Sequence, residues 1–353
     1  MNVAAIMETL ARDGGLRGMD FSGMEMEGAL FDGVVFEGCL FNGARLSRCT
    51  FQDVTARQTP FSGACLSECT LLRTDLQQSH LTEAILTDCH LEDVNLSNGD
   101  LRRADLGSCF LSKIDLSGTT LQDAVLAKAT LLDCLLNRTD LTGANLRQIL
   151  ASGADLSAAT LRRTDLTKAF LRGARMTGLS FDNCILLMTQ MDKADLTGAN
   201  FNRADVTQTN FAGANLTGAS FREARGEYTD FAGARAWEAD FRGAVLFMAN
   251  FKGADLQEAN LTEASLDQSL FMEAACRRTA FVGTRLPYTD FSHARLQGAD
   301  FSKARLAGAN MHAVAMGEAI WNGADTGAIY KTDPDLLEAE QWSARVIIRE
   351  VKP

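Results

Sequence analysis

The sequence predicts an all-β solenoid, built as one continuous array of five-residue repeats. Counting in fives from Leu16, all 63 positions up to Thr326 are uncharged, and most are Leu, Phe or Met. The residues two places earlier are also uncharged, and many are small, such as Ala104 and Ala199. A period of five fits neither the 3.6-residue period of a helix nor the two-residue period of a flat strand. Each repeat is therefore a short extended piece followed by a corner.

The repeat also assigns a direction to each side chain. The large central residue and the small residue two places before it point inward, and the other three face water. The run ADLTGANFNRADV at 194–206 follows this rule, with Asp, Asn, Thr and Arg outside. Corners favour Gly, Asn, Asp and Ser, and glycine recurs two residues after a centre, as at Gly23 and Gly28.

The repeats ADLTG, ANFNR, ANLTG, ADFRG, ADLQE and ADFSK resemble the motif of pentapeptide-repeat proteins: a small residue, Asp or Asn, Leu or Phe, and two variable residues. The resemblance covers residues 14–328 and implies a right-handed quadrilateral parallel β-helix with four repeats per coil. Residues 20 apart then stack in neighbouring coils. At ~4.8 Å per coil, the rod has about 16 coils and a length of roughly 75 Å.

Short helices are expected at both ends, because an open β-helix end exposes unpaired strand edges. Residues 1–13 form the predicted N-terminal capping helix. Residues 329–353 form a C-terminal helical cap or dimerisation tail, since Asp333-Pro334-Asp335 resembles a helix start with Pro at the first helical position. We leave a homodimer through this helix as an alternative to capping. Its apolar side would consist of Leu336, Leu337, Trp342 and Val346.

The nine cysteines are interpreted as packing residues. Seven of them occupy the small inward position, Cys276 is a centre, and Cys65 is expected outside. Because buried free Cys behaves as a small hydrophobic residue, we expect free thiols. Undersized centres mark weak points in the core. Gly226 and Ala236 make 225–238 the likeliest coil defect, although we expect a neighbouring side chain to fill the space rather than the wall to bend. Ala56 and Pro60 form a similar weak spot, and Ala151 a smaller one.

The sequence contains no pattern typical of catalysis or of cofactor binding. No phosphate-binding glycine loop is present, and no histidine triplet has metal-ligand spacing. We therefore expect no enzyme activity, no cofactor and no metal. The start lacks the features of a signal peptide and no apolar run is long enough for a membrane span, so we expect a cytoplasmic protein.

Charge limits the range of partners. The net charge is −11, and residues 1–100 hold 15 acidic and 6 basic residues. Direct nucleic-acid binding is not expected, because neutralising phosphates requires Lys and Arg. The acidity instead permits imitation of nucleic acid.

Apolar residues at positions where the repeat calls for polar ones are the candidate protein interface, because contiguous exposed apolar residues mark contact sites. A first group is expected on one face, and a second on another face further along the rod. The first comprises Phe110, Leu132, Leu150 and Phe170; the second comprises Ile185, Leu187, Met188, Tyr228, Val245, Phe247 and Met248.

These observations favour a non-catalytic scaffold, a rigid rod that binds a protein partner through exposed apolar patches. Two alternatives follow from the family resemblance. One is a DNA mimic that binds DNA gyrase or topoisomerase IV, as in quinolone resistance. The other is an accessory or adaptor of a bacterial type VI secretion system, which rests on analogy alone.

Overall fold

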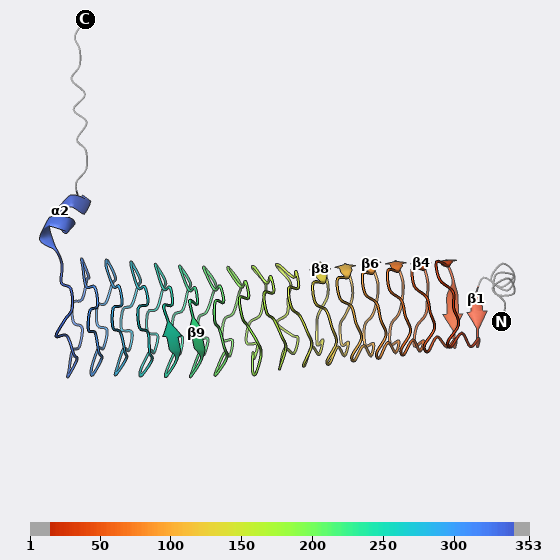
Figure 1. The fold of residues 1–353 in the computed structure, drawn as a ribbon, viewed down its shortest axis with the longest axis horizontal. Coiled ribbons are helices and arrows are strands. Elements are labelled where there is room, and N and C mark those ends of the chain that lie inside the picture. Colours follow the sequence, from red (N-terminus) through yellow and green to blue (C-terminus); the bar gives the residue numbers. More distant parts are fainter. Residues whose placement is uncertain (1–14, 342–353) are drawn as a thin grey trace, which may run out of the picture.

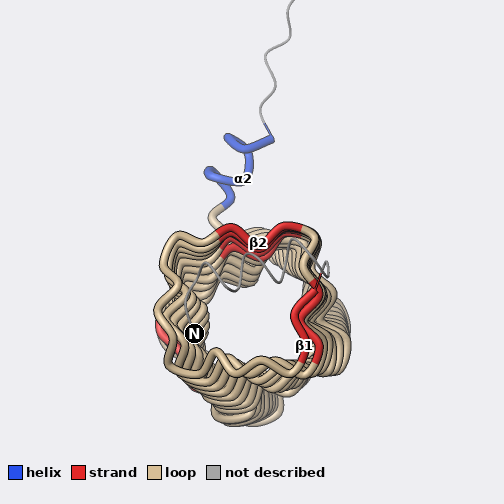
Figure 2. Tube along the Cα trace, turned by 90° about the vertical axis from the view of Figure 1, so that its right-hand side faces the viewer, coloured by secondary structure: helices blue, strands red, loops and turns tan. Residues whose placement is uncertain are grey.

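The chain winds into a straight stack of four-sided coils. The computed structural model describes residues 15–341, and Figures 1 and 2 show these residues as a long rod with a nearly square cross-section. All ladder pairings are parallel and join residues 20 apart, from Gly15↔Val35 at one end to Asn310↔Tyr330 at the other. This register confirms the predicted parallel β-helix with four repeats per coil.

Only a few segments are extended enough to count as strands, and each has three residues. The largest sheet has the order β2-β4-β5-β6-β7-β8, and β1-β3 and β10-β9 form two smaller sheets. The strands are β1 (Gly15–Arg17), β2 (Leu30–Asp32), β3 (Val35–Glu37), β4 (Thr50–Gln52), β5 (Thr70–Leu72), β6 (His90–Glu92), β7 (Phe110–Ser112), β8 (Thr130–Leu132), β9 (Arg225–Glu227) and β10 (Val245–Phe247).

Each corner of the coil is a tight turn that needs a left-handed residue. At a typical corner the N–H of Ala204 donates to the carbonyl of Phe201 at 3.0 Å, and Arg203 between them has φ of 59°. A positive φ at this turn position is readily adopted by glycine, which explains its recurrence two residues after a centre. Many corners nevertheless hold other residues, because the coils above and below fix the backbone.

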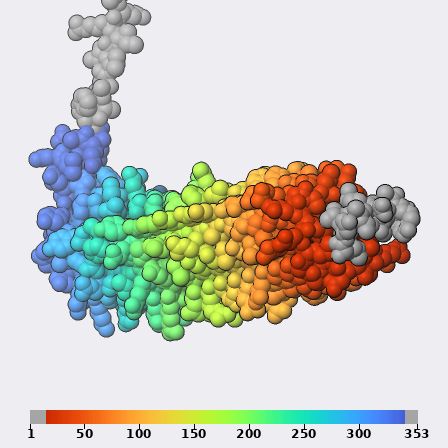
Figure 3. All heavy atoms as spheres, turned by 45° about the vertical axis from the view of Figure 1, so that its right-hand side comes forward, coloured from red at the N-terminus to blue at the C-terminus, as the bar shows by residue number. Residues whose placement is uncertain are grey.

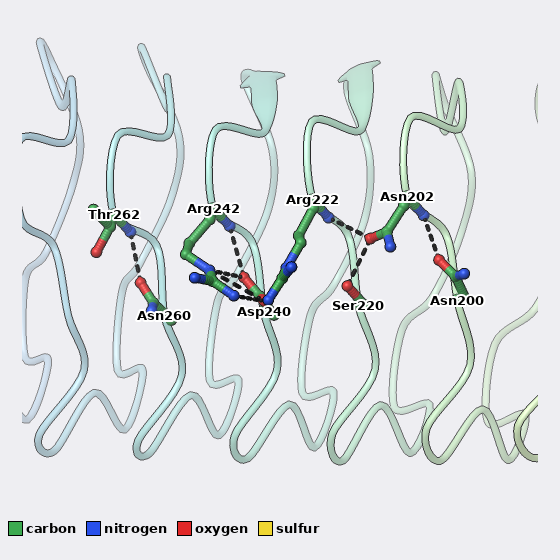
Figure 4. A network of polar contacts seen from close by, with 8 residues as sticks. All are labelled: Asn200, Asn202, Ser220, Arg222, Asp240, Arg242, Asn260 and Thr262. Carbon is green, nitrogen blue, oxygen red and sulfur yellow. Dashed lines mark hydrogen bonds and ion pairs between the residues drawn. The ribbon is translucent and has the colours of Figure 1, made fainter.

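The Asp or Asn that precedes a centre has a structural role. Its side-chain oxygen accepts the N–H two residues ahead, as Asp240 does from Arg242 at 3.1 Å and Asn260 does from Thr262 at 3.0 Å (Figure 4). Such a local bond stabilises the turn. Asp240 also pairs with the guanidinium groups of Arg222 and Arg242. These carboxylates therefore belong to the scaffold, as the sequence pattern indicates.

The core consists of stacked columns of inward side chains. Phe rings 20 residues apart stack face to face, with Phe231 4.7 Å from Phe251 between ring centroids. Rings 10 residues apart meet edge to face across the core, as Phe231 and Phe241 do at 5.6 Å. Small inward residues donate to the carbonyl 23 residues earlier, as Thr209 does to Leu186 at 2.7 Å. The polar groups in the core are thus satisfied.

All nine cysteines are free thiols, and most are buried. Burial raises the pKa of the Cys184 and Cys276 thiols. Cys65 lies partly exposed on the outside, as predicted, and its hydrogen bond with Ser47 lowers its pKa.

We expect Cys65 to react first with a thiol reagent in the native protein, because the thiolate is the reactive species. The deeply buried thiols should react only after unfolding. The measurement is the time course of native thiol titration, with Cys65→Ser as the comparison. An unchanged fast phase in Cys65→Ser would contradict this assignment.

Residues 225–238 show no interruption of the ladder, and the expected filling by a neighbouring side chain is confirmed at Gly226. The ladder continues through this segment, where β9 pairs with β10. A Cβ placed on Gly226 would lie 2.5 Å from Oγ1 of Thr229 and 2.9 Å from Cγ2 of Val206. Neighbouring side chains therefore fill the space that the small centre leaves.

Ladder pairing is instead interrupted elsewhere within residues 15–341. No bridge joins Leu40 to Pro60, Leu135 to Asp155, or Thr160 to Ser180. Pro60 has no N–H to donate, although its carbonyl still accepts from Phe41 at 2.8 Å. Small apolar cavities lie beside the two other undersized centres, about 10 Å³ near Ala56 and 20 Å³ near Ala151.

The predicted C-terminal helix is present as α2 (Pro334–Gln341). Asp333 caps it, since its Oδ1 accepts the N–H groups of Asp335 and Leu336. The expected capping of the rod by this helix is not seen in the described part of the chain. The helix projects to one side (Figures 1 and 2) and buries none of its residues, and Met316 in the last coil remains 41% exposed. Trp342, Val346 and residues 1–13 lie outside the described residues.

Candidate protein-binding surfaces

The first predicted group lies on one face of four consecutive coils, and we call it the apolar stripe (Phe110, Leu132, Leu150 and Phe170). Thr130 occupies the ladder position between Phe110 and Leu150, and Leu132 lies beside it, two residues along β8. Phe110 lies in β7 and Leu132 in the neighbouring β8, and bridges continue the same ladder from Thr130 to Leu150 and from Leu150 to Phe170. The four side chains are 38% to 48% exposed. Because outward residues 20 apart stack in register, the sequence places them on one face correctly.

The stripe extends one coil further than the sequence analysis indicated. The ring of His90 in β6 stacks on Phe110, with centroids 5.1 Å apart and planes 14° apart. A histidine at an outward position looks polar when the sequence is read alone. The 20-residue register, which places His90 directly beside Phe110, is the signal that could have identified it.

The second predicted group is divided into two clusters. Ile185, Leu187 and Met188 belong to one coil, whereas Tyr228, Val245, Phe247 and Met248 belong to two later coils. Polar residues lie between them, because Ile185 pairs with Asp205 and Asp205 pairs with Arg225. Leu187, Phe247 and Met248 are only partly exposed. The structure does not bring the two clusters together.

Further apolar residues are exposed that the sequence analysis did not select. They are Leu30, Val35, Leu40, Ile85, Leu135, Trp237, Leu270, Tyr288, Met316, Ile320 and Tyr330. Leu135 lies where the ladder to Asp155 is interrupted, so its exposure accompanies an opening between coils. Leu270 pairs with Asn250 on one side and with Asp290 on the other, so polar neighbours isolate it compared with the stripe.

The surface of the rod carries open polar depressions, and the core is nearly solid. Figure 3 shows a continuous side-chain surface on the face that it presents. Polar depressions lie beside Arg278 and beside Arg163. The two cavities inside the core are lined almost entirely by apolar residues and hold about one water molecule at most. A site for anything larger than a water molecule therefore has to lie on the outer surface.

A cluster of two histidines and one glutamate holds α2 against the rod. The carboxylate of Glu340 lies 3.3 Å from Nε2 of His293 and 3.2 Å from Nε2 of His312. The sequence analysis found no such cluster, because His293 and His312 are 19 residues apart and come together only through coil stacking. Glu340 joins them from the helix.

These three residues are also the one group of potential metal ligands that converges within residues 15–341. The hydrogen bonding of His312 argues against that role. The backbone N–H of Asp333 donates to Nδ1 of His312 at 3.2 Å, so the proton of the neutral ring resides on Nε2. A histidine that binds a metal through one ring nitrogen normally donates a hydrogen bond from the N–H of its other ring nitrogen. In His312 the other nitrogen, Nδ1, is an acceptor instead. The cluster is therefore a hydrogen-bonded latch.

We expect the latch to weaken in acid. The hydrogen bond from His312 is the main cause that lowers the pKa of Glu340 below its ordinary value of 4.5. Because the pKa of Glu340 is lower with the helix bound, ionised Glu340 stabilises the bound helix at pH values above its ordinary pKa. This stabilisation is lost as the pH falls through the lowered pKa of the bound form. The NMR signals of Leu336 and Leu337 should report release below about pH 4.5.

In Glu340→Ala, the NMR signals of Leu336 and Leu337 should be those of the released helix already at neutral pH. Glu338→Ala, which removes the same charge from the same helix, is the control. Signals of Leu336 and Leu337 that are identical in wild type and Glu340→Ala at pH 7 would contradict the latch.

The square coil, its five-residue period and its 20-residue register define a quadrilateral solenoid. Family comparison agrees: the family described as pentapeptide repeats matches ten overlapping segments between residues 16 and 323, and a pentapeptide repeat region matches residues 84–171. The chain belongs to the pentapeptide-repeat family. No curated protein matches it significantly.

Solved structures of the same family are similar over long stretches. QnrB1, a plasmid-mediated fluoroquinolone resistance protein, is 19% identical in a trypsin-treated form and covers 59% of this chain and 99% of its own, with a TM-score of 0.24. HetL, involved in heterocyst differentiation regulation in the cyanobacterium Nostoc sp. strain PCC 7120, is 22% identical over 94% of this chain and 98% of its own, with a TM-score of 0.15. At these scores the likeness carries no argument about function.

No helix in residues 15–341 has both the length and the apolar character needed to span a bilayer.

Proposed function

We propose that this chain is a non-catalytic scaffold that binds a protein partner through the apolar stripe. The observation that supports this proposal is the position of Phe110, Leu150 and Phe170 on one ladder of the rod, with Leu132 beside Thr130 in the coil between Phe110 and Leu150. A contiguous apolar surface of this kind is typical of contact sites, whereas single exposed apolar residues are ordinary.

Energetics favour the stripe over the isolated exposed residues. Covering four half-exposed side chains removes on the order of 300 Å² of apolar surface from water, worth about 7 kcal/mol before the entropic cost of association. A single residue such as Leu270 offers about a quarter of that, which does not offset the cost of immobilising a partner.

The rigidity of the scaffold adds to the affinity of the stripe. Phe110 lies in β7, which pairs with both β6 and β8, and Leu132 lies in β8, which pairs with β7. Their positions are therefore set before binding, and little ordering cost remains for this side of the interface.

The test is affinity purification with the triple variant Phe110→Ser, Leu150→Ser, Phe170→Ser. We expect it to lose partners that wild type retains, while circular dichroism and thermal unfolding stay unchanged because the residues contribute nothing to the core. The matched control is Leu30→Ser, Leu270→Ser, Tyr288→Ser, which removes the same number of exposed apolar side chains elsewhere. Identical partner profiles for the two triple variants would overturn the proposal.

A DNA-mimicking binder of DNA gyrase is the second candidate. The acidic composition of residues 1–100 supports it, with 15 acidic and 6 basic residues. The middle of the rod has the opposite balance, which weakens the candidate. A gyrase supercoiling assay tests it directly, and supercoiling that is unaffected at micromolar protein would eliminate it.

A further inference from the structure

The apolar stripe lies in the basic part of an acidic rod. Residues 101–175 hold 11 basic and 7 acidic residues, whereas residues 1–100 hold 6 basic and 15 acidic ones. The coils that carry Phe110 to Phe170 thus have a local charge of about +4 in a chain whose net charge is −11. Partners with acidic groups are attracted to these coils and are repelled by the N-terminal ones.

Two lysines form one edge of the stripe. Lys128 and Lys168 occupy exposed corners with φ of 62° and 57°, two residues before Thr130 and Phe170. Neither lysine has an ion-pair partner within residues 15–341. In the coil between them, Arg147 lies next to the corresponding corner, and it pairs with Asp165 at 3.1 Å. Their charges are therefore available to a partner.

The opposite edge carries both signs. Lys113 is 4.0 Å from Glu92, and Arg172 pairs with Asp192 at 3.1 Å. Asp133 beside Leu132 is the acidic residue next to the stripe on this edge. The charges on the two edges together still favour an acidic partner, because no negative charge compensates Lys128 and Lys168.

The spacing of the stripe selects the secondary structure of the partner. Three coil steps from Phe110 to Phe170 span about 14 Å. Three turns of an α-helix, which present one apolar residue per turn, span about 16 Å. In a β-strand every second side chain points to the same face, so three steps between such side chains take six residues and span about 20 Å. A helix lying along the rod axis therefore matches the stripe, and a strand in that direction does not.

A second copy of this chain would match the spacing even better, because its coils have the same rise. Its charges oppose the pairing, however. In an antiparallel pair, the edges with Lys128 and Lys168 of both copies meet, and like charges there disfavour association. In a parallel pair, each lysine edge meets the edge that carries both signs, which offers less negative charge than an acidic helix does. The unpaired lysines therefore favour an acidic helix over a second copy.

We infer that the stripe binds an amphipathic α-helix of a partner protein, with acidic residues flanking its apolar side and its axis along the rod. The inference rests on the proposed function and specifies the chemistry of the partner. Apolar anchors at positions i, i+3 or i+4, i+7 and i+11 contact Phe110, Leu132, Leu150 and Phe170. Acidic residues about two turns apart lie opposite Lys128 and Lys168, which are two coil steps, or ~10 Å, apart.

The test uses the full chain and two synthetic fluorescent peptides. Both peptides carry Leu at the four anchor positions, one with Glu flanking the anchors and the other with Lys at the same places. We expect fluorescence anisotropy to show at least ~10-fold tighter binding of the Glu peptide in low salt, with the difference reduced by added salt. Phe110→Ser with Leu150→Ser should weaken both peptides.

Charge exchange provides the discriminating measurement. Lys128→Glu with Lys168→Glu should reverse the preference, so that the Lys peptide binds more tightly than the Glu peptide. Lys303→Glu with Lys331→Glu makes the same change in net charge away from the stripe and should leave the preference unaltered. Because all four lysines are exposed, folding is retained in both variants.

The outcomes separate this inference from the proposed function. Equal binding of both peptides, or a preference that Lys128→Glu with Lys168→Glu does not change, overturns the acidic-helix inference. If neither peptide binds while the stripe variant still loses its partners in affinity purification, the partner has another chemistry and the scaffold function stands. If the purification profile is also unchanged, the scaffold function fails as well.

Discussion

Replacing Phe231 by alanine is expected to destabilise the rod by about 3–5 kcal/mol. Phe231 is fully buried and lies between Phe211 and Phe251, with stacked centroids at 5.2 Å and 4.7 Å. It also meets Phe221 and Phe241 edge to face. The substitution removes one ring from contact with four others. The cavity cannot collapse, because backbone bonds such as Phe231 N–H to Asn250 at 2.7 Å hold the coils at a fixed spacing.

Chemical denaturation of the full chain is the measurement, with Phe170→Ala as the matched control. Phe170 is the same residue type at an outward position, so its loss should change the free energy of unfolding by less than about 0.5 kcal/mol. Phe231→Leu should lie between the two, since leucine is the usual centre elsewhere. If Phe231→Ala costs no more than Phe170→Ala, the ring stacks do not stabilise the solenoid. In a repeat protein the loss is also expected to appear first as local opening of these coils.

The two undersized centres Gly226 and Ala151 are expected to respond in opposite directions when enlarged. Gly226→Ala should destabilise the protein by about 1–3 kcal/mol, because the new methyl group has no space. It would lie 2.5 Å from Oγ1 of Thr229, which now donates to the carbonyl of Val206 at 3.0 Å. Moving Thr229 away would break that buried bond, at a further cost of about 1 kcal/mol.

Ala151→Cys is expected to stabilise the rod by about 0.5–1 kcal/mol, the lower part of the usual range for filling a cavity. The apolar cavity of about 20 Å³ beside Ala151 is lined mostly by leucines, and it has room for the one sulfur atom that the substitution adds. Thermal unfolding of the two variants against wild type gives the comparison. A stabilising Gly226→Ala, or an Ala151→Cys that destabilises by more than about 1 kcal/mol, would contradict this packing of the two centres.

The direction of most side chains could be predicted from the sequence, because the inward positions of a filled solenoid admit no charge at any coil. Cys109 illustrates this: its phase alone places it inside, and the structure shows its thiol donating to Leu86 at 2.8 Å. The apolar stripe was predictable for the same reason. Once residues 20 apart are known to stack, Phe110, Leu150 and Phe170 must lie on one face.

The irregularities could not be predicted in this way. Gly226 and Ala151 look alike in sequence as undersized centres, but one is surrounded by Val206 and Thr229 and the other adjoins a cavity. The outcome depends on residues one coil away, which the local repeat does not specify. The same holds for the interruption between Thr160 and Ser180, where the local residues keep the repeat.

The C-terminal helix also combines a feature that the local sequence predicts with one that depends on distant residues. Asp333 and Pro334 in sequence are enough to place the start of α2, because capping and the fixed φ of proline act locally. Whether the helix covers the end of the rod or projects from its side depends on Glu340 meeting His293 and His312. That contact joins segments 28 and 47 residues away from Glu340.

The repeat in the sequence was enough to predict a solenoid with apolar residues on one outer face, because a five-residue period fits neither a helix nor a flat strand and the motif resembles that of pentapeptide-repeat proteins. The folded structure settles which weak centres are filled, where the ladder opens, and how α2 is held. It also showed which charges beside the stripe remain unpaired, as at Lys128 and Lys168. These features depend on distances between neighbouring coils, where side-chain size and hydrogen-bond partners are set by residues about 20 positions away.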